Sequence, residues 1–330
     1  MQKQFDVVAL GEAMLEFNQT TPGEPQYLQG FGGDTSNAAI AAARAGARGA
    51  YLTRVGADTF GNALLALWKK EGVNTSAVQR DAAAQTGIYF VTHGQNGHEF
   101  SYLRAGSAAS RMTPNWLGAT DAANAADPAP TSGRCSAASL IANSHILHLS
   151  AISLAISPDA CDTAFAAMAL ARTTSTRVSF DSNLRLKLWP LARAQACIAK
   201  AVSLSDIFLP SLEDMVTLTG LTDPGAIIDW SHALGAQTVV LKLGAEGALV
   251  SDGARRVQVA GKRVTLVDAT GAGDCFCGNL LARMALGDDV FNATHYANAA
   301  AALAVQGFGA VGPLPYAAQV TDFLSRGTPA

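Results

Sequence analysis

Short runs of β-branched, aromatic and other apolar residues return along this chain, and helical stretches such as residues 157–172 separate them. Apolar strands that alternate with helices indicate a parallel sheet covered on both faces. We therefore predict an α/β fold with a doubly wound, mostly parallel sheet flanked by helices. Ligands of such sheets bind beyond the carboxyl ends of the strands, where polar loops such as 182–185 and 210–214 emerge. The predicted strands are FDVVAL (5–10), AYLTRVG (50–56), HILHLSAI (145–152), RVSFDSN (177–183), DIFLP (206–210) and TVVLKLG (238–244).

Residues 13–32 and 87–105 depart from this rhythm because polar and apolar residues alternate in them. The second segment carries Asn96-Gly97, which is a strong signal for a hairpin turn. We predict antiparallel strands outside the main sheet, inserted into a single domain that spans residues 1–330. This small sheet could act as a lid over a ligand, or it could be a surface hairpin without a functional role.

The composition excludes some classes of partner. The chain has 330 residues, 49% of them hydrophobic, and its 23 basic and 26 acidic residues give a formal charge of −3. That charge offers no general attraction to nucleic acid or to an anionic membrane, so an anionic ligand must be held locally. The chain opens directly into a strand-like run without a secretory signal, and no apolar run approaches the roughly 18 residues of a membrane span. We expect a cytoplasmic protein.

The five cysteines are odd in number and scattered, without paired CxxC elements, which favours reduced thiols over a zinc site or disulfides. Residues 118–139, rich in alanine, serine, proline and aspartate, are typical of a mobile connection or a frayed helix, and we assign them no chemistry.

The turn GAGD, residues 271–274, stands before a run whose apolar residues recur at helical spacing. Its glycines therefore lie at a helix N-terminus, where free backbone N–H groups and the helix dipole bind anions. A carboxylate beside a phosphate is unfavourable unless it has another task, such as accepting the proton of an attacking hydroxyl. Asp274 therefore suggests phosphoryl transfer. The alternative is that Asp274 only caps the helix.

Two other nucleotide-binding motifs do not compete with this interpretation. The chain has no GxxxxGK[ST], so it is not a P-loop enzyme. Residues 307–312, GFGAVG, fit GxGxxG, but they follow a helix and continue into prolines, which is the wrong context for dinucleotide binding.

The chain resembles the ribokinase-like (PfkB) sugar kinases. DATGAGD resembles the C-terminal signature of that family, and GGDTSNAAIAAARAGA, residues 32–47, resembles its N-terminal sugar-binding signature. The resemblance covers nearly the whole length. GGDTSN, YLRAGSAAS and FDSNLRLKLW are most similar to the branch that phosphorylates 2-keto-3-deoxygluconate.

The resemblance implies a role for each matching residue. Asp274 is the expected base on the substrate hydroxyl, and Gly271, Ala272 and Gly273 are the expected anion hole. The other expected substrate-binding residues are Gly33, Asp34, Thr35, Ser36, Asn37, Tyr89, Tyr102, Leu103, Arg104 and Arg185. The expected nucleotide-binding residues are Asn183, Arg185, Ser211, Lys242, Leu243, Gly244, Ala245, Glu246 and Gly247, together with the GAGD turn.

Elementary chemistry agrees with part of this assignment. Sugar hydroxyls need short polar partners, which Asp34 and Asn37 offer at the start of a helix. A substrate carboxylate needs a guanidinium fork, and Arg104 and Arg185 are the candidates. For each arginine the alternative is an ordinary ion pair.

One departure from the family concerns the metal. Many members carry N-x-x-E after the strand that here reads DIFLP, whereas this chain has Ser211 and Asp214. Asp214 keeps a carboxylate, and we expect it to contact Mg²⁺ through water, because the phosphates of ATP need charge neutralisation. A monovalent cation such as K⁺ is expected near Asp268, and a homo-oligomer, dimer or higher, is the expected assembly.

The predicted function is ATP-dependent phosphorylation of 2-keto-3-deoxygluconate at its terminal C6 hydroxyl. One alternative is a fructokinase or ribokinase-type enzyme that acts on a neutral sugar. Another is a catalytically silent sugar-binding module, against which the presence of Asp274 argues.

Overall fold

The computed structural model describes residues 3–94, 97–119 and 135–326, and its largest element is an eight-stranded sheet. The six strands of this sheet that come first in the sequence pair in parallel, and the last two, an antiparallel hairpin, extend one edge. The predicted mostly parallel sheet is thus confirmed. In spatial order the strands are β14 (Arg256–Ala260), β13 (Gly247–Ser251), β12 (Thr238–Lys242), β11 (Ile207–Leu209), β10 (Arg177–Asp181), β9 (Ser144–Ser150), β1 (Phe5–Leu10) and β4 (Gly49–Leu52).

Helices cover both faces of this sheet, as the alternation along β1 shows. Val7 and Ala9 pack into a core shared with α1, α2, α9 and α10, whereas Val8 and Leu10 pack into the opposite core, with α3, α5, α6 and α8. Successive strand residues point to opposite faces, so an apolar run without polar alternation requires two cores. The helices are α1 (Asp34–Arg44), α2 (Thr59–Lys70), α3 (Ala137–Ala142), α4 (Ala151–Ala155), α5 (Pro158–Thr173), α6 (Leu191–Ser203), α7 (Leu212–Thr219), α8 (Pro224–Leu234), α9 (Ala272–Ala285), α10 (Val290–Ala304) and α11 (Ala317–Ser325).

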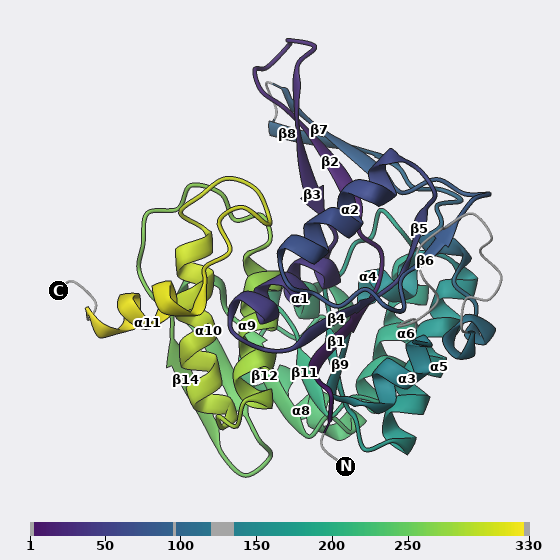
Figure 1. Cartoon of the computed structure of the whole chain (residues 1–330). Helices are drawn as coiled ribbons and strands as arrows, with labels where there is room; N and C mark the ends of the chain where they lie inside the picture. The colour runs from purple at the N-terminus through teal and green to yellow at the C-terminus, as the bar shows by residue number, and fades with distance from the viewer. Residues whose placement is uncertain (1–2, 95–96, 120–134, 327–330) are drawn as a thin grey trace.

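A second sheet of four strands stands outside the main one and projects at the top of Figure 1. Its order is β3 (Tyr27–Gly32), β2 (Met14–Gln19), β7 (Ile88–Gly94) and β8 (Gly97–Leu103). Strands in both predicted segments are therefore present. The pairing is antiparallel except between β2 and β7, which run parallel because the chain between them returns through the main domain. Asn96 of the predicted turn lies outside the described residues.

Some sequence expectations need correction. The run 50–56 is two strands, because the chain leaves the main sheet after β4, and β5 (Arg54–Gly56) pairs instead with β6 (Gln79–Asp81). The run 145–152 ends as a strand at Ser150, whose hydroxyl caps α4. The edge hairpin β13–β14 was not among the predicted strands.

Two further segments bear on the sequence predictions. In the segment 118–139, Gly118 ends a short 3₁₀ helix and α3 begins at Ala137, while residues 120–134 lie outside the described part. The GFGAVG segment follows α10 and forms bends and turns, without the strand-to-helix turn of a dinucleotide site. None of the helices within the described ranges is both long and apolar enough to span a membrane.

Candidate active site

The N-terminus of α1 brings the first predicted motif to the edge of the main sheet. Gly33 precedes this helix with a φ of 114°, and a Cβ there would stand 2.6 Å from the carbonyl oxygen of Glu12, so only glycine fits. The first helical turn, Asp34 to Asn37, is buried. Thr35 and Ser36 direct their side chains into the core, where they bond to the hydroxyl of Tyr51 and the indole of Trp68. Asp34 and Asn37 are the members whose side chains meet other site residues.

The GAGD turn begins α9 as predicted. Gly271, with a φ of 75°, is the residue before the helix, and no side chain caps the helix N-terminus. Asp274 lies within the first turn, and its Oδ2 accepts a hydrogen bond of 2.8 Å from Nδ2 of Asn37. The interpretation of Asp274 as a mere cap is therefore wrong. The uncapped N–H groups stay available to an anion.

The electrostatic environment of Asp274 suits a proton acceptor. Burial raises the pKa of its carboxyl to about 7, and the negative charges of Asp34 and Asp181 act in the same direction. The hydrogen bond from Asn37 and the positive charge of Lys242 partly oppose that rise. A carboxylate whose pKa lies near neutrality is matched to general-base work.

Asp34 links α1 to the loop after β10. Its Oδ2 accepts a hydrogen bond of 2.9 Å from Nδ2 of Asn183, and burial raises the pKa of Asp34. Oδ1 of Asn37 is buried without a hydrogen-bond partner among the described residues. A buried acceptor without a partner is rare in folded proteins, so a ligand hydroxyl at this position would satisfy it.

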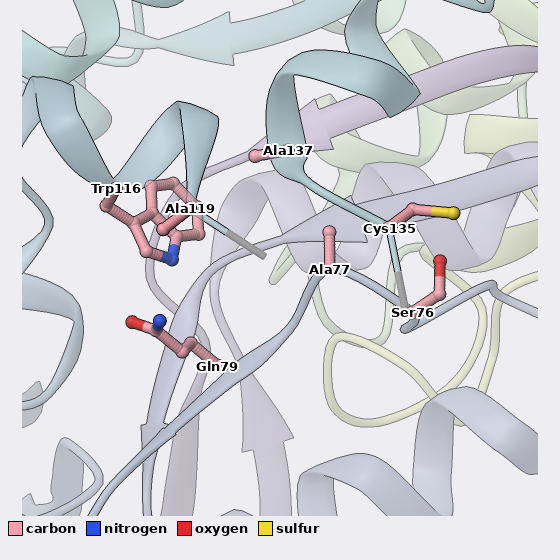
Figure 2. Close-up of a pocket in the computed structure, with 7 residues that line it drawn as sticks. All are labelled: Ser76, Ala77, Gln79, Trp116, Ala119, Cys135 and Ala137. Carbon is pink, nitrogen blue, oxygen red and sulfur yellow. The ribbon is translucent and has the colours of Figure 1, made fainter. Parts of the chain in front are cut away.

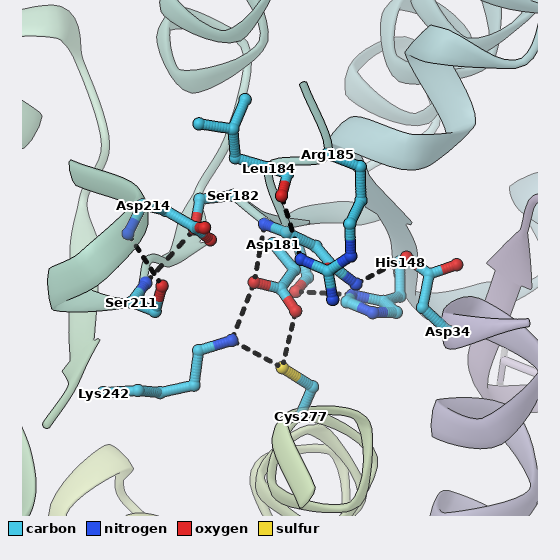
Figure 3. Close-up of polar contacts among 12 residues, drawn as sticks. Asp34, His148, Asp181, Ser182, Leu184, Arg185, Ser211, Asp214, Lys242 and Cys277 are labelled. Atoms are coloured by element: carbon cyan, nitrogen blue, oxygen red, sulfur yellow. Dashed lines mark hydrogen bonds and ion pairs between the residues drawn. The ribbon is translucent and has the colours of Figure 1, made fainter. Parts of the chain in front are cut away.

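The two candidate arginines have different surroundings. Arg104 forms an ion pair with Glu12, and the side chains are 11% and 1% exposed, so this guanidinium already has a carboxylate partner. Arg185 is exposed and donates to the carbonyl oxygen of Leu184 at 2.9 Å, and its positive charge acts on Asp34. Figure 3 shows the Arg185 side chain extending toward Asp34 and Asp181. The ion-pair alternative thus describes Arg104 and not Arg185.

The predicted tyrosines lie in the small sheet. Tyr89 is buried and donates its hydroxyl proton to Glu16, and its ring centroid lies 5.7 Å from that of Tyr102 in a tilted arrangement. Its ring also lies against Gly32, where an added Cβ would stand 2.4 Å from the Tyr89 hydroxyl oxygen. Tyr102 and Leu103 are exposed. The contact between Tyr89 and Gly32 joins β7 to β3, the strand that leads into α1.

Ser211 caps helix α7, and Asp214 in the first turn of that helix bonds to the loop after β10. The hydroxyl of Ser211 accepts from the backbone N–H of Asp214 and caps α7, while Oδ2 of Asp214 accepts a hydrogen bond of 2.7 Å from Ser182. Within the described ranges, no group of three or more His, Cys, Asp or Glu side chains could hold a metal. A single carboxylate fits contact with a hydrated ion that the phosphates of a nucleotide hold.

The nucleotide loop, residues 242–247, connects β12 to β13. It contains a short 3₁₀ turn, Gly244–Glu246, and ends at Gly247, where an added Cβ would stand 2.2 Å from the carbonyl oxygen of Val259. Asp268, expected near a monovalent cation, also holds two loops together: its carboxylate accepts from Thr270 and from the backbone N–H of Gly309.

Sequence reasoning missed Asp181 and Cys277. Asp181 is the last residue of β10, and its carboxylate oxygens contact Lys242 at 2.7 Å and the Cys277 thiol at 3.5 Å. One sequence feature could have pointed to Asp181: it is an aspartate at the end of a predicted strand, two positions before Asn183. A small cavity elsewhere is lined by Ser76, Ala77, Gln79, Trp116, Ala119, Cys135 and Ala137, none of them a candidate residue (Figure 2).

Comparison with known proteins finds sugar kinases that are similar to this chain over nearly its whole length. A 2-dehydro-3-deoxygluconokinase from Thermoproteus tenax is 33% identical over 98% of this chain and 95% of its own length. A probable fructokinase-4 from Arabidopsis thaliana is 30% identical over 96% of each chain. The crystal structure of a Vibrio cholerae fructokinase, in a form with fructose, ADP and calcium ion bound, superposes with a TM-score of 0.81 at 29% identity, over 96% of this chain and 98% of that one.

The fold and the site together define a carbohydrate kinase of ribokinase-like architecture. The particular family follows from the sequence, since residues 4–317 match the pfkB family carbohydrate kinase description. The chain belongs to that family.

Proposed function

We propose that this kinase phosphorylates 2-keto-3-deoxygluconate at its C6 hydroxyl, using ATP. The observation that carries the catalytic part is the position of Asp274, beside an uncapped helix N-terminus and with a pKa raised to about 7. The similarity to 2-dehydro-3-deoxygluconokinases and the exposed guanidinium of Arg185 support the choice of a sugar acid.

The proposed reaction uses residues that the fold already brings together. Asp274 accepts the proton of the acceptor hydroxyl, and the oxygen lone pair forms the new bond to the γ-phosphorus. The bond to the bridging oxygen breaks, and its electron pair leaves with ADP. Backbone N–H groups of Gly271, Ala272 and Gly273 bind the phosphoryl oxygens.

The remaining residues orient the substrates. Asp34 and Asn37 bind sugar hydroxyls, Arg185 pairs with the sugar carboxylate, and the loop 242–247 holds the nucleotide with Asn183. Asp214 would contact a hydrated magnesium ion through water, and that ion would neutralise charge on the phosphates of ATP. The small sheet acts as a lid that excludes water when substrate binds.

A neutral sugar is the second candidate substrate. It is favoured by the ion pair between Arg104 and Glu12, which removes one of the two cations expected to bind a carboxylate, and by 30% identity to a fructokinase. The deciding experiment measures kcat/KM of purified protein with ATP and a panel of 2-keto-3-deoxygluconate, gluconate, fructose and ribose. A higher value for fructose or ribose would reject the sugar acid and leave the kinase in place.

Two accessory properties belong to the same proposal. A dimer or larger oligomer is supported by large apolar side chains that the small sheet exposes, at Tyr27, Leu28, Phe100, Tyr102 and Leu103. Light scattering on a sizing column measures the oligomeric state, and a monomer mass rejects the oligomer.

The second property is a monovalent cation bound near Asp268. If it binds there, turnover should be faster in KCl than in tetramethylammonium chloride at equal ionic strength. Equal rates in the two salts reject that cation.

A further inference from the structure

Lys242 forms an ion pair at the centre of the site. Its ammonium donates to Oδ1 of Asp181 at 2.7 Å, and the two side chains are 13% and 5% exposed. Lys242 and Asp181 are the last residues of β12 and β10, so both stand where the parallel strands end. Figure 3 shows the lysine, the aspartate and Cys277 of α9 converging at this point.

The same ammonium lies beside the expected anion hole. A Cβ added to Gly273 would stand 3.8 Å from Nζ of Lys242 and would meet no other atom within 4 Å outside its own helix and its chain neighbours. The space in front of the GAGD turn is therefore open on the side where the ammonium lies. An anion bound by the N–H groups of this turn comes within reach of the lysine.

The hydrogen bonds of Lys242 leave donor capacity for such an anion. An ammonium has three N–H donors. In the described part of the chain they bond to Asp181 and, at 3.7 Å, to the weak acceptor Sγ of Cys277. At least one donor therefore has no strong protein acceptor, although the group is almost wholly buried. Burial of a charge costs free energy, so an ammonium that lacks one hydrogen-bond acceptor contributes little to the stability of the fold.

We propose that Lys242 is a catalytic cation that binds the transferring phosphoryl group, and that Asp181 is the positioning residue that holds it. As the acceptor oxygen bonds to the γ-phosphorus and the bond to the bridging oxygen breaks, negative charge on the phosphoryl oxygens is stabilised by the ammonium. No proton leaves Lys242, because the paired carboxylate holds its pKa above the ordinary value despite burial. The inference rests on the sugar-kinase activity but not on which sugar is phosphorylated.

The first test compares Lys242→Met with Lys200→Met, a matched change on the outer face of α6, where the ammonium lies over the ring of Phe165. Loss of one preorganised charge on a transition state lowers kcat by about a hundredfold to a thousandfold. We expect that loss in Lys242→Met, with the KM for the sugar within about threefold of wild type, and Lys242→Arg should recover part of it. Lys200→Met should match wild type.

A double variant separates catalysis from folding. Lys242→Met leaves Asp181 as an unpaired buried charge, whereas Asp181→Asn with Lys242→Met removes both charges and should restore the melting temperature. If Lys242 is catalytic, the double variant stays slow while folded, and Asp181→Asn alone keeps more activity than Lys242→Met. Near wild-type kcat in the double variant would overturn the proposal, because the pair would then be structural.

The assay uses the sugar with the highest kcat/KM in the panel above, so a wrong sugar assignment does not affect it. A second readout is nucleotide affinity without sugar: Lys242→Met should weaken ATP binding more than ADP binding, because ADP lacks the γ-phosphate. Equal weakening of both nucleotides would contradict a contact with the transferring group.

Discussion

Nδ2 of Asn37 donates a hydrogen bond of 2.8 Å to Oδ2 of Asp274 and thereby joins the first turns of α1 and α9. The residues stand 237 positions apart in the sequence. This bond connects the sugar-binding motif to the proposed base, so the two ends of the chain form one site. It also limits the positions that the carboxylate can adopt.

Asp274→Asn tests the proposed base. General-base catalysis contributes about a hundredfold to ten-thousandfold, so kcat should fall by that amount while ATP binding stays intact. Steady-state kinetics and calorimetric ATP titration measure the two properties. Turnover close to wild type would exclude Asp274 from proton transfer.

The same substitution should change stability in a pH-dependent way. A folded-state pKa of about 7, above the ordinary 3.8 of an aspartate, means that the native state binds more protons between these values. Wild-type stability therefore falls as pH rises from 4 to 7, and Asp274→Asn removes that loss. Its melting temperature should exceed wild type by a few degrees at pH 8 and match it near pH 4. If the melting temperatures of variant and wild type differed equally at both pH values, the buried Asp274 carboxyl would not have a raised pKa.

The pH profile of kcat/KM tests the environment of Asp274. The rate should rise with one ionisation near pH 7, because the base works only when deprotonated. The hydrogen bond from Asn37 lowers this pKa, while Asp34 and Asp181 raise it and Lys242 lowers it. Asn37→Ala should consequently move the acid limb to higher pH, and an unchanged limb would mean that the bond does not act on the base.

Gly273→Val tests the anion hole. A Cβ at this position would have Nζ of Lys242, at 3.8 Å, as its nearest atom outside its own helix, so the fold should persist, but the valine side chain occupies the space through which a phosphate approaches the backbone. We expect a wild-type circular dichroism spectrum with loss of activity. Full activity would show that the turn does not bind the transferring group.

Gly278→Ala tests the close packing that brings Asn37 to Asp274. A Cβ at Gly278 would stand 2.2 Å from the carbonyl oxygen of Ala38 on α1, so the two helices would have to separate. Overpacking of this kind destabilises by about 1–3 kcal/mol. Gly118→Ala, where an added Cβ has no neighbour within 4 Å, is the matched control. Denaturant unfolding should show a loss in the first variant and none in the second.

Much of the main sheet could be predicted from the sequence because apolar runs buried on both faces show no polar alternation. The edge hairpin could not, since β14 is largely exposed and reads as a polar segment. The GAGD turn was predictable because its function is local: a glycine turn followed by a helical pattern. The N-terminal signature, residues 32–47, was identified by its resemblance to the family signature.

Contacts between distant residues had no local signal. Asp181 and Lys242 are 61 positions apart on strands that flank β11, and no spacing rule joins them. The pairing of Arg104 with Glu12 was hidden for the same reason, although arginine as an anion-binding residue could be predicted. The sequence shows which chemical group a side chain carries, whereas the fold determines which distant residue it contacts.

The central claim is that the acceptor is a sugar acid held by Arg185, and kcat/KM for 2-keto-3-deoxygluconate and for fructose tests it most directly. One charge-assisted hydrogen bond contributes about 1.5–3 kcal/mol, or roughly tenfold to a hundredfold in binding. We predict that wild type prefers the acid by at least that factor and that Arg185→Ala removes most of the preference while fructose use changes little. A wild-type preference for fructose, or an unchanged preference in Arg185→Ala, would contradict the account.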